Sequence, residues 1–450
     1  MSSPRRLRLS SILRLGGCLV VLAGTAARAD QPVPMPSVLS RWSVTFYGYV
    51  DLDTMWDSLQ GPTDLLGNFT LPRAGTYAAS HDQYTVSIRN SRLGFRIGAP
   101  DLGWLKASAL VEIDFVGNQP AGITEAAFFN NPGLRIRHAY FNAQTPVVDV
   151  LVGQTWSLFG WGAYFFPASV AMQGLPGQVF NRTAQVRVSK AVKFSPDLGM
   201  EFAIAALRPP ERAGGLPDGQ AGLKLLIPAW KAYRSVAAGQ PTLDALALGV
   251  SGVLRRFAVP AFEPNATSDV TATGWGVSVD LLLPIIPAST TSHENALTFT
   301  GSYVRGAGTS DLYQGLSGPA FPPLPNPGHV TPAPTYSASI DQGLVGFDSA
   351  GNLHPVSWQS FILGLQYWFP GNTGLWVSAN YSHLQSFNAT TLANGSRTVF
   401  VRSQYASGAL MWDAAKPLRV GLELAWMKQD FIDPGPSVLR RVQLSAWYYF

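Results

Sequence analysis

The chain has 450 residues, of which 46% are hydrophobic, 12% aromatic and only 13% charged. A soluble domain of ordinary composition carries about 25% charged residues, so this composition favours a membrane protein. After the first thirty residues, a charge, a proline or a polar side chain breaks each apolar run before it is long enough to cross a membrane, which argues against a bundle of membrane helices. The 13 Trp, 15 Tyr and 24 Phe exclude intrinsic disorder. The composition therefore favours a β-structure whose strands are apolar on one face only.

Residues 1–29 are predicted to be a secretory signal peptide. Arginines form a basic start, Leu15–Ala27 forms a short apolar segment, and Ala27-Arg28-Ala29 is a cleavage motif. An anchoring helix is the alternative, but this apolar segment is too short to cross a membrane. We therefore expect cleavage before Asp30 and a short periplasmic segment, 30–42, ahead of the main fold.

Removal of this segment changes the charge of the chain. Its five arginines are the whole excess of 32 basic over 27 acidic side chains, so the mature chain has no net charge. A balanced charge gives no indication of a nucleic-acid partner. The single cysteine, Cys18, also lies in this segment, so the mature chain has no disulfide, no Cys-metal site and no Cys nucleophile.

Alternation with a period of two residues recurs from about residue 43 to the end of the chain. In the first such segment one face is apolar, and the other carries Tyr47, Tyr49, Asp51 and Asp53. The apolar faces are continuous and end in aromatic residues, while the opposite faces carry charges. This is the pattern of a membrane β-barrel, with lipid outside and a polar lumen inside.

The pattern predicts an all-β fold, a transmembrane antiparallel β-barrel of about sixteen strands over residues 43–450. The expected strands are 43–56, 84–98, 104–116, 133–144, 147–156, 181–194, 199–208, 219–227, 244–257, 271–284, 296–306, 358–369, 374–384, 398–413, 417–428 and 438–450. The alternation slips in the second strand, which predicts a β-bulge near Asn90–Ser91. The weakest stretch is 209–243, where Leu223–Ser235 fits a strand, a turn insertion or a short helix. Short turns alternate with longer loops, as in bacterial outer-membrane barrels.

The chain ends in a strand that places Val442, Leu444, Ala446, Tyr448 and Phe450 on one face. A terminal strand that ends in phenylalanine resembles the segment by which outer-membrane barrels are recognised for assembly. We therefore expect Tyr448 and Phe450 to engage the barrel-assembly machinery.

Several short segments resemble the DcaP-like family of trimeric outer-membrane porins. They are Phe46–Val50, Ser91–Arg96, Leu134–Tyr140, Val152–Ser157 and Arg441–Ser445. The resemblance implies a homotrimer of sixteen-stranded barrels in the outer membrane of a Gram-negative bacterium, reached through the periplasm, that passes small anions such as dicarboxylates. One departure is that no heptad segment precedes the first strand.

Charged residues at inward positions are the candidates for selectivity. The basic candidates are Arg89, Arg96, Lys106, Arg135, Arg137 and Arg187, and the acidic ones are Asp51, Asp53, Glu112 and Asp114. The alternation also places Arg305 toward the lumen. Arginines in a narrow pore favour anions, and the guanidinium fork binds both oxygens of a carboxylate. The alternative is that these arginines pair with the acids as structural networks.

The loop after the fifth expected strand, 157–180, is aromatic and carries no charge. In porins the loop at this place folds inward and narrows the channel, so we expect an inward-folded loop here. The candidate constriction residues are Trp156, Phe159, Trp161, Tyr164, Phe165 and Phe166. A neutral aromatic loop opposite arginines suits an amphipathic or aromatic anion. Alternatively, these aromatics belong to the rim girdle or to a trimer contact.

Other functions have weaker support in the sequence. No His-Glu-x-x-His, Gly-x-Ser-x-Gly or phosphate-binding loop is present, so we predict neither a metal nor another cofactor and no enzyme activity. A surface receptor or adhesin acting through loop 307–357, or a lipid-modifying enzyme with His138, remains the alternative. The main prediction is a porin with a water-filled channel, whose partners are outer-membrane lipid and small anionic solutes.

Overall fold

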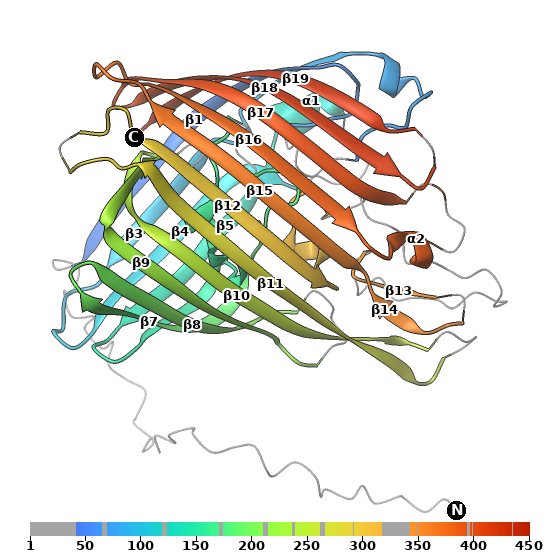
Figure 1. Ribbon diagram of the computed structural model, residues 1–450, viewed down its shortest axis with the longest axis horizontal. Helices are drawn as coiled ribbons and strands as arrows, with labels where there is room; N and C mark the ends of the chain where they lie inside the picture. Colours follow the sequence, from blue (N-terminus) through green and yellow to red (C-terminus); the bar gives the residue numbers. More distant parts are fainter. Residues whose placement is uncertain are drawn as a thin grey trace, which may run out of the picture. The chain divides into compact units, whose positions relative to one another are not determined.

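The computed structural model describes most of the chain from Trp42 to Phe450 (Figure 1). The described residues are 42–64, 70–118, 124–170, 174–209, 215–235, 239–261, 266–290, 292–316, 343–348, 350–393, 397, 399–433 and 435–450. The predicted signal peptide, 1–29, and the segment 30–41 lie outside them.

Among the described residues, seventeen strands form one closed antiparallel sheet, the barrel in Figure 1. The strands are β1 (Ser43–Asp57), β2 (Gln83–Ser87), β3 (Arg92–Gly98), β4 (Lys106–Gly117), β5 (Gly133–Gln144), β6 (Asp149–Trp156), β7 (Arg182–Ser195), β8 (Leu198–Leu207), β9 (Asp218–Arg234), β10 (Thr242–Pro260), β11 (Asp269–Ile286), β12 (Leu297–Ala307), β15 (Ser357–Trp368), β16 (Leu375–Ser386), β17 (Phe400–Ala415), β18 (Leu418–Phe431) and β19 (Ser437–Tyr449). β1 pairs with both β2 and β3, each strand from β3 onward pairs with the next in this order, and β19 pairs with β1 to close the ring. β2 and β3 both pair with β1 as one interrupted strand, so the predicted barrel of sixteen strands is confirmed.

The interruption between β2 and β3 reverses the faces of this strand. On β1, three residues separate the partners of Ser87 and Arg92, whereas four residues separate Ser87 and Arg92 themselves. One extra residue shifts the alternation by one position. Val86 is therefore exposed before the break and Phe95 after it, although their numbers differ in parity. This confirms the β-bulge predicted near Asn90–Ser91.

Alternation decides which side chains lie on the outer wall. On β1, Val44, Phe46 and Val50 are 63%, 51% and 55% exposed, whereas Asp51 and Asp53 are fully buried. Successive side chains of a strand point to opposite faces, so an apolar row on each strand builds a continuous apolar belt around the barrel. Such a belt is suited to contact with lipid.

The short turns and the C-terminus lie at one rim of the barrel, here called the turn rim, and the long loops lie at the other, the loop rim (Figure 1). The loops contain the hairpin of β13 (Val345–Phe347) and β14 (Leu353–Pro355) and the short helices α1 (Glu125–Asn130), α2 (Ala389–Leu392), η3 (Ala78–Ser80), η4 (Phe159–Phe165) and η5 (Ser310–Leu312). In the described part of the chain, every helix is too short or too polar to cross a membrane.

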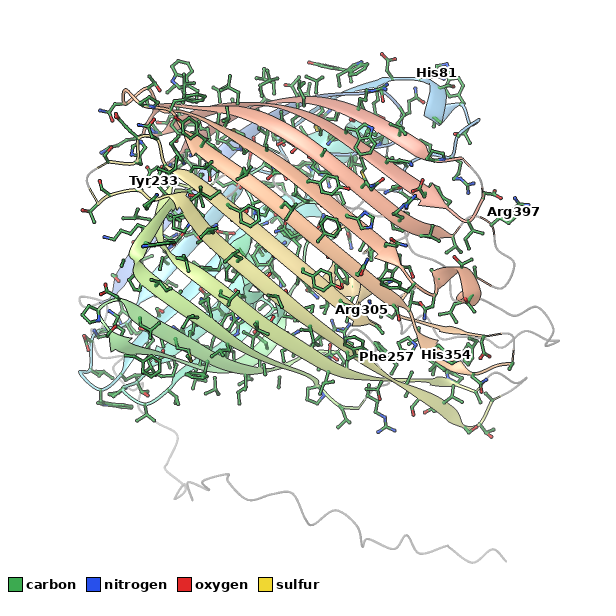
Figure 2. The ribbon with its side chains drawn as sticks, in the orientation of Figure 1. His81, Tyr233, Phe257, Arg305, His354 and Arg397 are labelled. Atoms are coloured by element: carbon green, nitrogen blue, oxygen red, sulfur yellow. The ribbon has the colours of Figure 1, made fainter. Side chains whose placement is uncertain are left out.

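The structure settles one stretch that the sequence left open and corrects the placement of one arginine. Residues 223–234 are strand, because β9 continues to Arg234 with an irregularity opposite Ala245 and Leu246. Arg305, expected in the lumen, lies on the outer face of β12, which corrects that expectation (Figure 2). The inward side of β12 is taken by the buried Val304, and the guanidinium of Arg305 lies 4.4 Å from the ring of Phe387.

Candidate functional site inside the barrel

The chain after β6 turns into the barrel through a tight reversal. Gly160, Trp161 and Gly162 all have positive φ angles, of 73°, 54° and 57°. Glycine adopts this conformation at little cost, whereas a β-carbon makes it unfavourable. The two glycines therefore allow η4 to double back, and Trp161 is held between them in a conformation that few residues adopt.

One wall of the barrel is built to receive this reversal. The backbone N–H of Phe159 donates to Gln220 Oε1 of β9, and that of Gly160 donates to Ser251 Oγ of β10, both at 2.8 Å. A β-carbon on Gly222 would lie 2.8 Å from the Trp161 ring. Glycine at this position thus leaves the space into which the indole packs.

The loop then crosses the lumen to the wall formed by β16–β18. Ser169 Oγ donates to Glu423 of β18 at 2.9 Å, and the N–H of Val170 donates to the same carboxylate at 2.8 Å. Asn380 of β16 donates to the carbonyl of Ala168 at 2.6 Å. The loop is therefore fixed to opposite walls at its start and at its middle, and it divides the interior of the barrel.

A cavity of about 210 Å³ remains between the loop and the wall of β1 and β3–β5. The wall side of this cavity carries Arg92, Arg96, Arg137 and Glu112. Its loop side is uncharged and is formed largely by Trp156, Phe166, Phe180 and Gln178. This passage, with charge on one side and aromatic rings on the other, is the candidate constriction.

Some of the predicted basic residues are tied into ion pairs. Arg137 donates to Glu112 at 2.7 Å and to Asp114 at 3.0 Å, and Arg135 donates to both oxygens of Asp114 at 2.9 and 2.6 Å. Arg137 is only 3% exposed. Arg135 and Arg137 therefore pair with acids in a structural network, which was the alternative to a role in selectivity.

Arg89 is likewise engaged away from the passage. Its guanidinium donates to Asp64 at 2.8 Å, and the Phe128 ring of α1 lies 3.8 Å from it. Arg89 is 3% exposed and Asp64 is 1% exposed. This pair joins the loop after β1 to the wall and helps to hold α1 in place.

Three other arginines near the passage lack an acidic partner. Arg96 lies 4.3 Å from the ring of Tyr47, and Arg182 lies 4.6 Å from the ring of Trp156. Arg187 donates to the side-chain oxygen of Gln185 at 2.8 Å. In the part of the chain that the structure describes, no carboxylate forms an ion pair with any of these three guanidinium groups.

Sequence reasoning missed Arg182 because the alternation of β7 assigns it to the outer face. Arg182 pairs with Trp156 at the very ends of β6 and β7, where the two strands give way to the inward loop. Its guanidinium therefore stacks on Trp156 and Phe180, inside the barrel. Its position close after an aromatic loop is the sequence feature that could have identified it.

The remaining predicted charges lie outside the constriction. Asp51 and Asp53 are fully buried between β1 and β19, where Asp53 accepts hydrogen bonds from Asn90 at 2.6 Å and from Gln443 at 3.0 Å. Lys106 lies at the turn rim with a side chain that is 68% exposed, 3.7 Å from Asp101.

The aromatic residues of the loop divide into two groups. Trp156 and Phe166 line the passage. Phe159, Trp161 and Phe165 are instead buried against the barrel wall. Tyr164 donates its hydroxyl to the carbonyl of Ala245 at 3.2 Å, and Lys224 Nζ lies 4.3 Å from its ring. Most of the predicted aromatic residues therefore position the loop, and two of them shape the opening.

Residues 17–315 match the family model of the Gram-negative porins, which covers more than half of the chain. The chain belongs to this family. The family resemblance read from the short motifs is thereby confirmed.

Solved structures with the same fold include several outer-membrane channels. DcaP, the outer membrane channel of Acinetobacter baumannii, has a TM-score of 0.62 and 19% identity over 91% of this chain and 98% of its own. An anion-selective porin from Comamonas acidovorans has a TM-score of 0.49 and 12% identity over 91% of this chain and 100% of its own. No curated protein matches the sequence. At these identities the similarity shows the fold alone.

Family and fold make this porin an outer-membrane channel protein. The outer membrane is thus its location, as predicted from the sequence. The apolar belt on the outside of the barrel faces the lipid of that membrane.

The C-terminal strand closes the barrel of this porin. Phe450 and Gly48 of β1 exchange two backbone hydrogen bonds of 3.1 Å, and the Phe450 ring lies 5.3 Å from that of Phe46. A β-carbon on Gly48 would approach the Phe450 ring within 2.9 Å. Tyr448, 56% exposed, lies on the outer face. Both aromatic side chains are thus placed where a partner in the membrane could meet them.

His138, the residue considered for catalysis, is held inside the wall beside the constriction. Its Nδ1 lies 2.9 Å from Thr155 Oγ1, and its Nε2 lies 3.9 Å from Glu112. The ring is 7% exposed. These contacts fit a residue that supports the wall of the passage.

Proposed function

We propose that this porin is a water-filled channel for the passive diffusion of small hydrophilic solutes, and that it favours anions of the dicarboxylate type. The observation that carries the proposal is Arg96, which lines the passage without a carboxylate partner among the described residues, opposite a side that is uncharged. Arg182 and Arg187 also lack a carboxylate partner in the described structure and lie next to the aromatic residues of that side, where Arg182 stacks on Trp156 and Arg187 donates to the Trp156 carbonyl.

The neutral loop strengthens the effect of these arginines. A carboxylate on the loop would attract cations and would offset the field of the wall, but residues 157–180 carry no charge. The side chain of Arg96 forms neither an ion pair nor a hydrogen bond in the described part of the chain, so its guanidinium keeps its donors for a passing anion. Its planar fork matches the two oxygens of a carboxylate, and two such groups match a dicarboxylate.

The aromatic side of the passage suits the carbon skeleton of such a solute. Trp156, Phe166 and Phe180 contact one another with ring centroids 4.6–5.2 Å apart. These packed rings present an apolar, rigid surface opposite Arg96. The paired Arg135 and Arg137 then support the wall and contribute less to selectivity. The arginines proposed to act in selectivity are thus fewer than the sequence predicted.

The proposal is tested by the reversal potential of the purified porin in a planar bilayer under a salt gradient. We expect an anion preference in the wild type, and a permeability ratio that moves toward unity in the double variant R96Q/R182Q, because both unpaired charges are removed from the passage. The control R305Q removes the same kind of charge from the outer wall and leaves the ratio unchanged. A cation preference in the wild type, or an equal change in R305Q, would contradict the proposal.

We infer that the porin assembles as a homotrimer, as the resemblance of its motifs to trimeric porins implies. Conductance that appears in steps of three, together with the mass of the detergent-purified particle, tests this inference. Single steps from a particle with the mass of one chain would refute it.

A further inference from the structure

A second cavity, of about 510 Å³, lies on the outer wall, where the sheet faces lipid. Its floor is formed by the small residues Ala406 and Gly408 of β17. Trp426 of β18 lies directly beside this floor, and Trp56 of β1 lies at the far side of the groove, beyond β19. We call this feature the outer groove.

The outer groove exists because the apolar belt has small side chains at this place. A β-carbon on Gly408 would meet no atom within 4 Å. Closer to the turn rim on the same face of β17, Leu410 and Trp412 are 47% and 49% exposed and fill the belt. The groove is therefore a local hollow in an otherwise full apolar surface, open toward the membrane.

Basic residues stand at the end of the groove that is nearer the loop rim. Arg440 of β19 lies directly beside Trp426 in the sheet register and lines the groove. Lys428 follows Trp426 on the same face of β18, and its Nζ lies 3.4 Å from Asp430. Arg402 of β17 pairs with the same Asp430 at 2.6 Å.

The charges of this cluster do not balance. Arg402, Lys428 and Arg440 are cations, and Asp430 is the acid that the first two share. Arg440 is exposed, and in the described part of the chain no carboxylate forms an ion pair with it. Basic side chains just beyond an apolar belt lie at the depth of lipid headgroups and attract anionic ones.

We propose that the outer groove binds a phosphate-bearing lipid. One acyl chain lies on Ala406 and Gly408 along the β17 side of Trp426. The phosphate lies at the loop-side edge of Trp426, where it accepts hydrogen bonds from Arg440 on the other side of this ring, with Lys428 nearby. The arrangement fits a lipid because the apolar floor extends toward the middle of the belt while the cations lie at its loop-side edge. A single lipid molecule has an acyl chain to match the apolar floor and a phosphate to match the cations, in the same order along the membrane normal.

The test compares two lipids that differ only in the phosphate, dioleoyl phosphatidic acid and dioleoylglycerol, by native mass spectrometry of the full porin in detergent. We expect tighter binding of the phosphatidic acid. The variant R440Q weakens that lipid about fivefold, as expected for one headgroup contact, and leaves the dioleoylglycerol unchanged. The variant G408L fills the floor and weakens both lipids. The matched control K193Q removes an exposed lysine at the turn rim and changes neither.

Four results would overturn the proposal. The first is equal binding of the two lipids with no effect of R440Q. In the second, inorganic phosphate competes fully while G408L has no effect, which would mark Arg440 as a site for free anions. In the third, G408L removes a second copy of the chain rather than a lipid, which would make the groove a protein contact. In the fourth, G408L binds both lipids as the wild type does although far-ultraviolet circular dichroism shows a folded barrel.

Discussion

At the scale of single residues, the partners of each arginine decide what it does. Arg137 is buried and bound to two carboxylates, whereas Arg96 lies over the ring of Tyr47 and forms no ion pair in the described part of the chain. The same residue type therefore serves as a structural tie at one position and as a free donor at the other. A buried ion pair that loses one member leaves an uncompensated charge, which is costly.

We expect R137Q to lower the free energy of unfolding by about 3 kcal/mol, because Glu112 and Asp114 would lose a buried counter-charge. R96Q is expected to cost less than about 1 kcal/mol, because it breaks no ion pair. Denaturant unfolding in detergent, followed by tryptophan fluorescence, measures both values. Equal losses in the two variants would refute the distinction between paired and unpaired arginines.

At the scale of elements, the loop after β6 is positioned by contacts at its start and at its middle. Glu423 of β18 accepts hydrogen bonds from Ser169 and Val170, and Tyr405 donates its hydroxyl to the same carboxylate at 2.8 Å. Glu423 is only 2% exposed. One acidic side chain on the wall thus holds the middle of the loop on the far side of the lumen.

We expect E423A to loosen the middle of the loop and to raise the conductance and its noise, because three donors lose their acceptor. Each unmet donor costs about 1–3 kcal/mol, which is large compared with thermal energy. Single-channel recording measures the change. The control D197N alters an exposed acid in the turn after β7 and leaves the conductance as it is. A conductance of E423A equal to that of the wild type would show that the loop does not depend on Glu423.

At the scale of the whole molecule, the barrel depends on the meeting of its first and last strands. β1 and β19 pair over nine consecutive positions, from Tyr49 with Tyr449 to Asp57 with Arg441. The salt bridge of Arg441 with Asp57, at 2.7 Å, lies within this seam and is almost fully buried. Closure removes both free edges of the sheet, which is how a barrel satisfies its backbone inside lipid.

We expect F450A to lower the fraction of chains that reach the folded barrel in the membrane, because the predicted assembly signal loses its last aromatic side chain. The folded fraction retains a stability near that of the wild type, since the backbone hydrogen bonds to Gly48 remain. Heat-modifiable mobility on gels of membrane fractions measures this. V442A, on the same outer face of β19, is the control, and an equal loss of folded chains in both variants would contradict the prediction.

The strands and their faces were accessible from the sequence because alternation is a local property. Each of the sixteen expected strands corresponds to a strand of the barrel, and the extra residue near Asn90–Ser91 was detectable as a slip in phase. The exceptions lie where local rules fail. Arg182 stands at a strand end that gives way to the inward loop, and Arg305 depended on the phase assumed for β12.

The sequence by itself determined the membrane barrel, because apolar and polar residues two positions apart dictate which face meets lipid. The tertiary structure alone decided which arginines remain unpaired. Arg89 meets Asp64, and Arg137 meets Glu112, across 25 residues of chain, through the register of neighbouring strands and the path of a loop. Local pattern sets neither the register of the strands nor the path of a loop. The sequence alone therefore does not distinguish the paired arginines from the unpaired ones.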